Sequence, residues 1–596
     1  MTGIVSALID FADPHQPDGP RLRHAFGVAC EVLVAHRLED VRAVLDAVQA
    51  AAQRGAWCVG YLRYEAAPAF DAALAVHASD GPLAWFAVHE KTLPWPQPGE
   101  EAPVQVQWQE LLPRPVFDAA LVELQRAIAD GEYYQVNFTA QMPGVLSGGA
   151  AGQPARALFN ALQRAQPGGY AAFLDTSDEQ VLSVSPELFF DWRAGHILTR
   201  PMKGTAPRGA GPEEDAAQAK ALRTSVKECA ENVMIVDLLR NDLSRIAEPF
   251  SVRVPRLFHT EALPAVWQMT SDIQARTRSG CSLADVFTAL FPCGSVTGTP
   301  KVRAMQAIRA LESGPRGVYC GAVGVVQPGG AAIFNVPIRT VTLRGSTARC
   351  GIGSGITSGA MADGEWREWR LKQAFVQRAS APFELLETLG MCDGRLRNAD
   401  AHLARMAQAA RHFGYPWVAR QAEVALQSMV QQYAQGAWRV RLLLDARGRV
   451  QAEAHALPAS PARARLQLAD RALDDTRGEF VRFKTTRRAH YDAFTPTQPG
   501  VFDTLLWNVD GELTECTRGN VAFLLYGRWV TPPLCCGLLA GVGRAHALRE
   551  GCIGEEAVVR LSDLPRVQAL AFVNSVRGWI PADLDRPQAQ GACVAG

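Results

Sequence analysis

The pattern of apolar and polar positions divides the chain into two parts. Up to about residue 376, short strand-like runs such as 322–326 and 333–341 mix with two stretches of helical period, at 213–246 and 300–312. After residue 384, strand-like runs such as 439–444 alternate with helical stretches such as 400–413. This alternation predicts a separate α/β unit in the second part, and we place the boundary near Ala379.

Three stretches without either period interrupt these patterns. Residues 94–115 are rich in Pro and Glu, residues 143–154 are rich in Gly, Ala and Pro, and residues 377–384 are typical of an interdomain link. We therefore expect an N-terminal segment at 1–110, a central domain at 111–376, the link, and a C-terminal domain at 385–596. The N-terminal segment, including 61–67, is interpreted as completing the sheet of the central domain.

Composition excludes several classes of function. The 596 residues are 48% hydrophobic and should form roughly three to five structural units. The formal net charge is zero, which argues against a nucleic acid or an acidic membrane as partner. Since there is no apolar run of about 18 residues and no leader pattern, we expect a soluble, cytoplasmic protein. The 13 cysteines include no CxxC pair, and we interpret them as reduced and mostly buried.

Lysine is scarce in this chain. Only seven of the sixty basic residues are Lys, and Lys484 is the only one after Lys372. Arg cannot replace Lys where a neutral amine must act as nucleophile, base or carbonyl partner. Codon bias with random survivors is the simpler explanation, but Lys203, Lys301, Lys372 and Lys484 all lie in clusters of Gly, Thr and acidic residues. These four lysines are therefore candidates for chemistry.

Two pairs of glutamates have helical spacing: Glu228 with Glu231, and Glu365 with Glu368. Four carboxylates brought together would form an oxygen-rich site for a hard cation such as Mg²⁺. Spacing alone favours the simpler alternative of two solvated helix faces, with a salt bridge from Glu368 to Lys372. Trp366 and Trp369 favour the cation site, because large apolar neighbours indicate that this helix is not fully exposed.

Other polar residues lie at the ends of predicted strands. Glu187 and Lys203 each lie on a tight turn that ends or follows a short strand. The glycine run 351–355 follows a strand and can present backbone N–H groups to an anion, although it lacks the spacing of a dinucleotide-binding loop. Thr299 and Pro300 occupy the N-cap and first positions expected for the helix at 300–312, and a carboxylate can bind at such a helix start.

In their order along 110–375, these segments resemble the chorismate-utilising enzymes. The segments are SPELFF (185–190), RPMKGTAPRG (200–209), KECAENVMIVDLLRNDL (227–243), GSVTGTPKVRAM (294–305), YCGAVG (319–324), IRT (338–340), GIGSGI (351–356) and EWREWRLKQA (365–374). The resemblance implies an α+β fold of large β-sheets flanked by helices. It also implies Mg²⁺ held through Glu231 and Glu368, with Glu228 and Glu365 in support, against the ring carboxylate of chorismate.

The same resemblance implies a set of substrate-binding residues: Tyr319, Arg339, Gly353, Gly355, Lys372, Thr299 and Gln268. Tyr319, Arg339, Gly355 and Lys372 match the family's binders of the two substrate carboxylates. Gln268 stands where many relatives have His. We expect its amide to be able to donate the corresponding hydrogen bond to the ring.

The residue at position 203 selects the reaction among these relatives. Those that aminate chorismate at ring carbon 2 have a small residue there, whereas those that make 4-amino-4-deoxychorismate have Lys. A neutral amine can attack carbon 2 while Glu187 protonates the departing 4-hydroxyl, and ammonia then displaces the enzyme at carbon 4. Lys203 must be uncharged for this role, which a nearby Mg²⁺ and partial burial would favour.

The second part contains a single lysine, Lys484, so a cofactor that binds a lysine through a carbonyl has no other choice there. Its segment FKTTRRAHYD (483–492), with GELTECTRGN (511–520), TPPL (531–534) and GLLAGVGR (537–544), resembles the class IV pyridoxal-phosphate enzymes. That family includes the branched-chain and D-amino-acid aminotransferases. The resemblance implies an α/β domain of fold type IV with pyridoxal 5′-phosphate as cofactor.

The class IV resemblance also implies roles for single residues. Lys484 would bind the cofactor covalently and move protons, and Glu515 would pair with the pyridine nitrogen. The phosphate group would be held by Arg405, the backbone N–H groups of Val542 and Gly543, and Ser575. A surface acid and an exposed helix arginine are the ordinary interpretations of Glu515 and Arg405, and their order around one lysine favours the cofactor site.

Together the two resemblances imply a bifunctional enzyme of 4-aminobenzoate synthesis, in the folate pathway. The first half would aminate chorismate to 4-amino-4-deoxychorismate, and the second, a lyase, would expel pyruvate from it. We expect the ammonia to come from a separate glutamine amidotransferase subunit (component II). One alternative is an anthranilate-type synthase fused to a class IV aminotransferase, against which Lys203 argues. Another is a catalytically silent chorismate-binding protein, against which the full set of candidate residues argues.

Overall fold

The computed structural model describes residues 5–16, 19–96, 104–148, 154–209, 212–262, 266–474, 476 and 478–585. The chain forms two compact units, Met1–Pro382 and Phe383–Gly596. The division therefore falls inside the stretch 377–384. Helix α9 (Ala374–Ala379) occupies the first part of that stretch, which the sequence pattern had assigned to a link.

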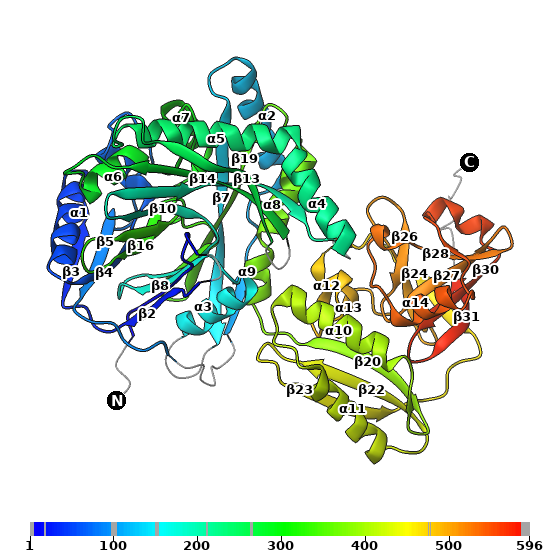
Figure 1. Ribbon diagram of the computed structural model, residues 1–596. Helices are drawn as coiled ribbons and strands as arrows, with labels where there is room; N and C mark the ends of the chain where they lie inside the picture. Colours follow the sequence, from blue (N-terminus) through cyan, green and yellow to red (C-terminus); the bar gives the residue numbers. More distant parts are fainter. Residues whose placement is uncertain are drawn as a thin grey trace. The chain divides into compact units, whose positions relative to one another are not determined.

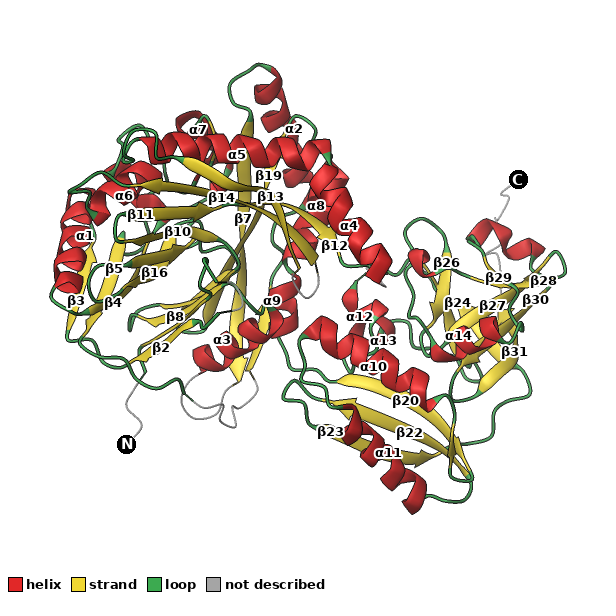
Figure 2. Ribbon diagram, in the orientation of Figure 1, coloured by secondary structure: helices red, strands yellow, loops and turns green. Residues whose placement is uncertain are grey.

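The first unit is built on two large, largely antiparallel sheets (Figures 1 and 2). The first sheet has the order β15 (Gly298–Thr299), β7 (Gln135–Gly148), β19 (Thr347–Thr357), β18 (Thr340–Arg344), β9 (Gln180–Ser185), β8 (Tyr170–Asp175), β1 (Ala7–Phe11) and β2 (Leu22–Phe26), with β6 (Val104–Trp108) also paired to β7. The second has the order β12 (Met202–Pro207), β14 (Val266–Arg276), β11 (His196–Arg200), β10 (Leu188–Arg193), β17 (Ala332–Asn335), β16 (Ala322–Val326), β4 (Trp57–Leu62), β5 (Ala84–His89) and β3 (Glu31–Ala35), with β13 (Arg253–Ala262) also paired to β14.

Alternating apolar residues on these strands build three cores. One core contains strand residues from both sheets and no helix residue, which places it between the sheets. A second core joins the second sheet to α1 (Leu38–Gln53), α5 (Val226–Ser244) and α6 (Leu283–Leu290). A third joins the first sheet to α2 (Arg114–Ala129), α3 (Pro154–Ala165), α7 (Lys301–Leu311), α8 (Ala362–Lys372) and α9. This is the expected α+β arrangement of large sheets flanked by helices.

The N-terminal segment contributes strands to both sheets. Strands β1 and β2 extend the first sheet beyond β8, and β3, β4 and β5 extend the second sheet beyond β16. Residues 1–110 thus contribute strands to two sheets, where the sequence interpretation expected one.

Several boundaries differ from the sequence expectation. The helical stretch 213–246 is two helices, α4 (Pro212–Thr224) and α5, because the backbone of Ser225 is extended and its side chain caps α5 by accepting from the Glu228 N–H. The run 333–341 is also divided, into β17 and β18. Stretches 94–115 and 143–154 were expected to lack regular structure, yet they contain β6 and the end of β7. Residues 97–103 and 149–153 lie outside the described residues.

The second unit contains a four-stranded and an eight-stranded sheet. The smaller has the order β21 (Arg395–Leu396), β20 (Leu385–Cys392), β22 (Ala437–Leu444) and β23 (Val450–Ala456), and packs against α10 (Ala399–Phe413) and α11 (Ala419–Gln432). The larger has the order β26 (Leu513–Cys516), β25 (Asp503–Trp507), β24 (Ala464–Leu468), β31 (Gly578–Asp585), β30 (Ala569–Asn574), β27 (Asn520–Leu525), β28 (Arg528–Thr531) and β29 (Glu555–Glu556). Three short helices accompany it: α12 (Glu479–Arg482), α13 (Ala489–Asp492) and α14 (Val542–Arg549).

Two expectations from composition can be compared with the described part of the chain. None of its helices combines the length and the apolar character needed to cross a membrane. All twelve of its cysteines are free thiols, but only half of them are buried, so the expectation of mostly buried cysteines holds only in part.

Candidate functional site

The first candidate site centres on Lys203 in β12. Its Nζ donates to the backbone oxygen of Ser295 at 3.1 Å. A Cβ atom added to Gly355 in β19 would lie 3.4 Å from the same Nζ, so the amine faces the glycine face of that strand. Position 203 therefore lies between β12, the end strand of one sheet, and β19, an interior strand of the other.

Glu187 lies in the turn between β9 and β10 and is buried. Burial is the largest cause that raises the pKa of its carboxyl group, and the charge of Lys203 is among the effects that oppose it. Its Oε1 has no hydrogen-bond partner among the described residues. A buried carboxyl group with a raised pKa is suited to donate a proton to a leaving group.

The two glutamate pairs lie within electrostatic reach of one another. Burial raises the pKa of Glu228 and Glu231, and repulsion from Glu368 adds to the rise in both. Burial, and to a smaller extent the charge of Glu368, also raises the pKa of Glu365. The Oε2 atom of Glu365 accepts a hydrogen bond from the Ser354 hydroxyl at 2.6 Å. The helix pair α5 and α8 therefore brings the four predicted carboxylates together.

Two lysines partly neutralise the charge of these four glutamates. Burial alone would raise the pKa of Glu368, but Lys372, whose Nζ is 2.7 Å from Oε1, makes the net shift downward. Glu231 lies 4.0 Å from Lys227. Among the residues that the structure describes, no group of three or more His, Cys, Asp or Glu is set closely enough to hold a metal ion. The donors are nonetheless carboxylates, which suit Mg²⁺, and a cation would relieve their mutual repulsion.

Glycines 351, 353 and 355 lie inside β19, whereas the sequence pattern placed them after a strand. Because they alternate, all three face the same side of the sheet. A Cβ at Gly351 would lie 2.3 Å from the ring of Tyr319, and one at Gly355 would lie 2.5 Å from Gln135 Nε2. Lys372 donates to the Gly353 oxygen at 2.8 Å. The three glycines thus form a strip without side chains, which the Tyr319 ring and the Lys203 amine approach closely and to which Lys372 is hydrogen-bonded.

The remaining predicted substrate residues, Arg339, Thr299 and Gln268, have different surroundings. Arg339 has a left-handed backbone, and burial followed by the charge of Arg378 lowers its pKa to about 10. Thr299 is not a helix cap, since Pro300 is the N-cap of α7 and makes no side-chain bond; the Thr299 hydroxyl has no partner within the described chain. Gln268 accepts from Thr205 and donates to the Gly204 oxygen at 2.9 Å, which leaves one amide hydrogen.

The second candidate site centres on Lys484, which follows α12. Burial, then the charges of Arg488 and Arg405, lower the pKa of its amine to about 7. Glu515 in β26 is also buried, and burial raises its pKa to about 7 against a hydrogen bond donated by the Tyr491 hydroxyl at 2.6 Å. The second unit therefore contains an amine that loses its proton near neutral pH and a buried carboxyl group whose pKa is raised.

The start of α14 lies close to the backbone after β30. A Cβ at Gly543 would lie 2.5 Å from the carbonyl carbon of Asn574 and 2.7 Å from the Ser575 nitrogen, so the first turn of α14 packs directly on the turn after β30. Arg405 in α10 donates to the Ala540 oxygen at 2.9 Å, just before that turn. The residues predicted to hold a phosphate group, namely Arg405, Val542, Gly543 and Ser575, therefore come from three segments that meet.

Comparison with known families follows this division into two units. The model of chorismate binding enzymes matches residues 15–378, more than half of the chain. The chain belongs to the chorismate-binding enzyme family. The model of class IV aminotransferases matches residues 384–584, so the second unit is a class IV aminotransferase domain.

Individual relatives cover the chorismate-binding part. Aminodeoxychorismate synthase component 1 of Klebsiella aerogenes is 40% identical over 261 residues, which are 44% of this chain and 57% of that protein. Aminodeoxychorismate synthase of Streptomyces griseus is 41% identical over 301 residues, which are 49% of this chain and 41% of that protein. The chain thus spans about half the length of these curated relatives. Anthranilate synthase component I of Streptococcus pneumoniae TIGR4 has a TM-score of 0.50 at 23% identity, covering 63% of this chain and 92% of that structure, which is a likeness of fold.

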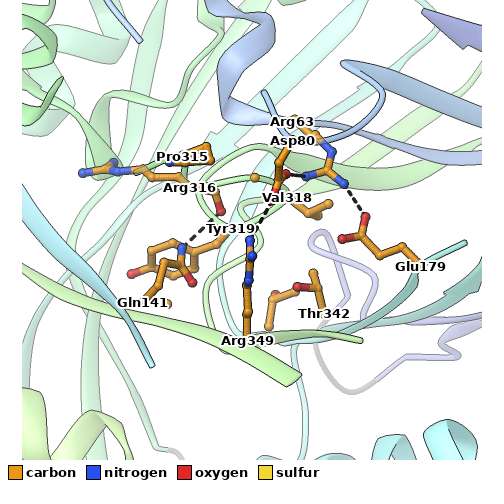
Figure 3. A pocket seen from close by; sticks show the side chains of 13 residues that line it. Arg63, Asp80, Gln141, Glu179, Pro315, Arg316, Val318, Tyr319, Thr342 and Arg349 are labelled. Atoms are coloured by element: carbon orange, nitrogen blue, oxygen red, sulfur yellow. Dashed lines mark hydrogen bonds and ion pairs between the residues drawn. The ribbon is translucent and has the colours of Figure 1, made fainter. Parts of the chain in front are cut away.

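A polar cavity in the chorismate-binding unit is lined by Tyr319 and by a network of charged side chains (Figure 3). Arg63 donates to Asp80 at 2.8 Å and pairs with Glu179, and Arg349 donates to the other Asp80 oxygen at 2.6 Å. These four residues line the cavity together with Tyr319, and none of them belongs to β12.

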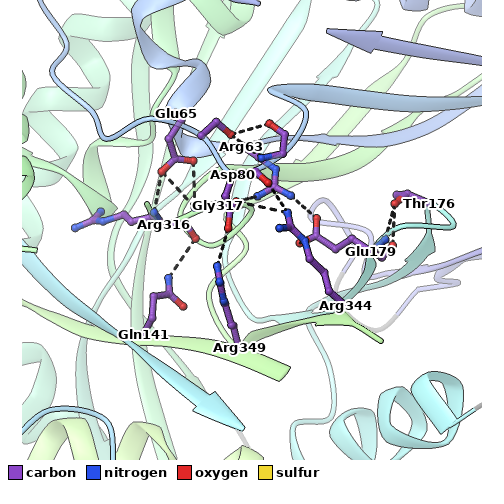
Figure 4. Close-up of polar contacts among 12 residues, drawn as sticks. Arg63, Glu65, Asp80, Gln141, Thr176, Glu179, Arg316, Gly317, Arg344 and Arg349 are labelled. Carbon is purple, nitrogen blue, oxygen red and sulfur yellow. Dashed lines mark hydrogen bonds and ion pairs between the residues drawn. The ribbon is translucent and has the colours of Figure 1, made fainter. Parts of the chain in front are cut away.

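The loop that leads to Tyr319 is held by the buried Glu65 (Figure 4). The Glu65 carboxylate accepts from the backbone N–H groups of Arg316 and Gly317, at 2.7 and 3.1 Å for the shortest bonds. Arg316 is itself buried and donates to the backbone oxygens of Val296 and Asn137 at 2.7 Å each. Arg316 therefore ties together the segments next to Ser295, Gln135 and Tyr319.

Sequence reasoning missed Gln135 and this supporting cluster. Gln135 in β7 is fully buried, and neither amide atom has a hydrogen-bond partner among the described residues. A buried amide without a partner is costly and indicates a group that meets a ligand. The available signal was a polar residue inside the strand-like run 135–138, which alternation alone does not mark as functional.

Proposed function

We propose that the chain converts chorismate to 4-aminobenzoate in two steps, one in each unit. The observation that carries the first step is the position of Lys203, whose amine faces the glycine strip of β19 and interacts with the buried Glu187. The relatives named aminodeoxychorismate synthase support the same reaction at 40% and 41% identity.

In the first step, the amine of Lys203 bonds to ring carbon 2 of chorismate while Glu187 protonates the 4-hydroxyl, which leaves as water. Ammonia then bonds to carbon 4, and the bond between carbon 2 and Lys203 breaks as the ring double bonds shift back. The net change replaces the 4-hydroxyl group by an amino group. Lys203 is regenerated.

The carboxylate donors on α5 and α8 suit magnesium chemically, although they would have to move closer together to hold the ion. Glu231 and Glu368 would hold the ion, with Glu228 and Glu365 in support, and the ion would neutralise charge at the ring carboxylate. Lys372, now paired with Glu368, would be released to meet a substrate carboxylate. Removing divalent cations with a chelator should therefore stop chorismate consumption, and adding Mg²⁺ back should restore it.

The second step is proposed for the class IV aminotransferase domain with pyridoxal 5′-phosphate. When bound, this cofactor supplies an electron sink that stabilises negative charge on an attached substrate. Lys484 would move the proton from one substrate position to another, Glu515 would keep the pyridine nitrogen protonated, and burial by β26 and α13 would exclude water. Loss of pyruvate from 4-amino-4-deoxychorismate then leaves the aromatic ring.

Ammonia is proposed to come from a separate glutamine amidotransferase subunit. The support is the name of a relative, component 1, which implies a further component for that protein. Free ammonium should replace this subunit in the test tube if the first unit contains the whole amination site.

The test is product analysis. Purified protein is incubated with chorismate, Mg²⁺, ammonium and pyridoxal 5′-phosphate, and the aromatic product and pyruvate are identified by chromatography and mass spectrometry. Equimolar 4-aminobenzoate and pyruvate are expected without any amino acceptor. Anthranilate would contradict the role of Lys203, and accumulation of 4-amino-4-deoxychorismate would contradict only the second step.

A further inference from the structure

A chain of buried hydrogen bonds links the smaller sheet of the second unit to Ser575. Glu387 Oε2 lies 2.6 Å from His402 Nδ1, and His402 Nε2 lies 2.7 Å from Ser575 Oγ. All three residues are buried, with exposed fractions of 2%, 1% and 9%. Neither Glu387 nor His402 was among the residues assigned to the phosphate site.

The directions of these bonds follow from the charge of Glu387. Burial would raise the pKa of Glu387, but Arg405, followed by His402, lowers it to about 2. The carboxylate is therefore ionised and can only accept, so His402 Nδ1 must carry a hydrogen. A neutral His402 then has a bare Nε2, which accepts the hydroxyl hydrogen of Ser575. In that state Ser575 cannot donate to a second acceptor.

A phosphate group changes the requirement at Ser575. Phosphate oxygens are acceptors and carry negative charge, so a useful hydroxyl must point its hydrogen at them. Ser575 can do so and keep its hydrogen bond to His402 only if His402 Nε2 also carries a hydrogen and donates to Oγ. This arrangement makes the imidazole a cation with two donors, one to Glu387 and one to Ser575.

The charged groups around His402 make that change favourable when phosphate is present. Arg405 donates to both Glu387 oxygens, at 2.8 and 2.6 Å, so Glu387 and Arg405 balance one another. Lys484 is coupled electrostatically to Arg405 and Glu387, and burial, Arg488 and Arg405 lower its pKa. Without phosphate, a charged His402 would add an uncompensated buried charge, whereas with phosphate it would be matched.

We propose that His402 is a positioning residue that takes up a proton when the phosphate group of the cofactor binds, and so turns the Ser575 hydroxyl toward that group. The proposal rests on the proposed cofactor, pyridoxal 5′-phosphate. It does not depend on which reaction the second unit performs.

Proton uptake on ligand binding is the direct test. Pyridoxine 5′-phosphate and pyridoxine have no aldehyde, so Lys484 cannot react with them and its titration does not enter through a covalent bond. Binding is measured by titration calorimetry at pH 8 in buffers of different ionisation enthalpy. We expect uptake of about one proton per bound pyridoxine 5′-phosphate and none for pyridoxine. Because the bound state holds the extra proton, affinity for the phosphate should fall as pH rises.

Two variants distinguish a positioning role of His402 from a purely structural one. His402→Gln should bind pyridoxine 5′-phosphate about tenfold more weakly, without proton uptake and with a flatter pH profile. His412→Gln is the matched control, because His412 lies on the same helix and pairs with Glu479 at 3.2 Å. It should retain the wild-type uptake and affinity. In a Ser575→Ala background, His402→Gln should have little further effect, since its action passes through Ser575.

The outcomes are distinct. Binding of pyridoxine 5′-phosphate with equal proton uptake by wild type and His402→Gln, or with no uptake by wild type, would overturn the proposal while leaving the proposed function intact. Failure of wild type to bind either pyridoxine 5′-phosphate or pyridoxal 5′-phosphate would overturn both the cofactor assignment and this proposal.

Discussion

The two lysines assigned to chemistry lie in opposite electrostatic surroundings. Lys203 lies among acids, and its charge lowers the pKa of Glu187 and Glu231. Lys484 is buried and faces Arg488 and Arg405, so its own pKa falls to about 7. In the second unit, protein groups alone therefore lower the pKa of the amine enough for it to lose its proton near neutral pH. In the first unit, a divalent cation at the carboxylates would take over the charge balance that Lys203 now provides.

The largest expected effect is the loss of the Lys203 amine. Lys203→Arg should reduce chorismate amination by about 10³-fold or more, the order found when an enzymatic nucleophile is removed. Conversion of 4-amino-4-deoxychorismate to 4-aminobenzoate should be unchanged, because Lys484 is intact. Both rates are measured on the same purified variant.

Lys301→Arg is the matched control for Lys203→Arg. Lys301 pairs with Asp242 at 2.9 Å and also donates to the Leu290 oxygen, a structural role that Arg can take over. It should keep amination within a few-fold of wild type. Equal losses in Lys203→Arg and Lys301→Arg would contradict a chemical role for Lys203.

The next largest effect tests the role of Glu187 as the proton donor of the first site. Glu187→Gln should lower the amination rate by about 10²- to 10⁴-fold, the range for a general acid, with little change in the KM for chorismate. The rate is followed by loss of chorismate absorbance. A large rise in KM with an unchanged kcat would indicate that Glu187 binds substrate rather than protonating the leaving group.

A smaller effect concerns the glycine that lets α14 approach Ser575. Gly543→Ala would put a Cβ 2.5 Å from backbone atoms that cannot rotate away, so affinity for pyridoxal 5′-phosphate should fall by about tenfold or more. Gly554→Ala is the control, since the nearest atom to its Cβ would be 3.6 Å away. Unchanged cofactor affinity in Gly543→Ala would show that the cofactor phosphate lies elsewhere.

The smallest effect is a shift in pH dependence at Lys484. The rate of covalent capture of pyridoxal 5′-phosphate should rise with pH, with a midpoint near 7, as the amine loses its proton. Arg488→Gln removes a charge that lowers this pKa, so the midpoint should move to higher pH and capture at pH 7 should slow a few-fold. The exposed Arg482→Gln is the control. An unchanged midpoint in Arg488→Gln would contradict the claim that Arg488 lowers the pKa of Lys484.

Much of the fold was accessible from sequence because strand and helix periods are strong where a core is buried. The strand 322–326 and the helix near 400–413 appear within a residue of their predicted bounds. The break at Ser225 was missed because apolar spacing continues across it, and only the capping bond to Glu228 reveals two helices. Long-range pairing, which places Gly351–Gly355 inside β19, is likewise absent from local pattern.

The candidate sites show a similar limit. Lys203, Glu187 and the four glutamates could be selected because their residue types are rare or paired in sequence. Gln135 and His402 could not, since an amide in a strand and a histidine in a helix are ordinary until their buried partners, or lack of partners, are known. Their significance arises from contacts between segments far apart in the chain.

Product analysis of Lys484→Arg tests the division of labour between the two lysines most directly. The variant is incubated with chorismate, Mg²⁺ and ammonium, and all chorismate-derived compounds are identified by mass spectrometry. We predict that 4-amino-4-deoxychorismate accumulates and that neither 4-aminobenzoate nor anthranilate appears. Formation of either aromatic acid at the wild-type rate, or no amination at all, would contradict the assignment of one amine to each step.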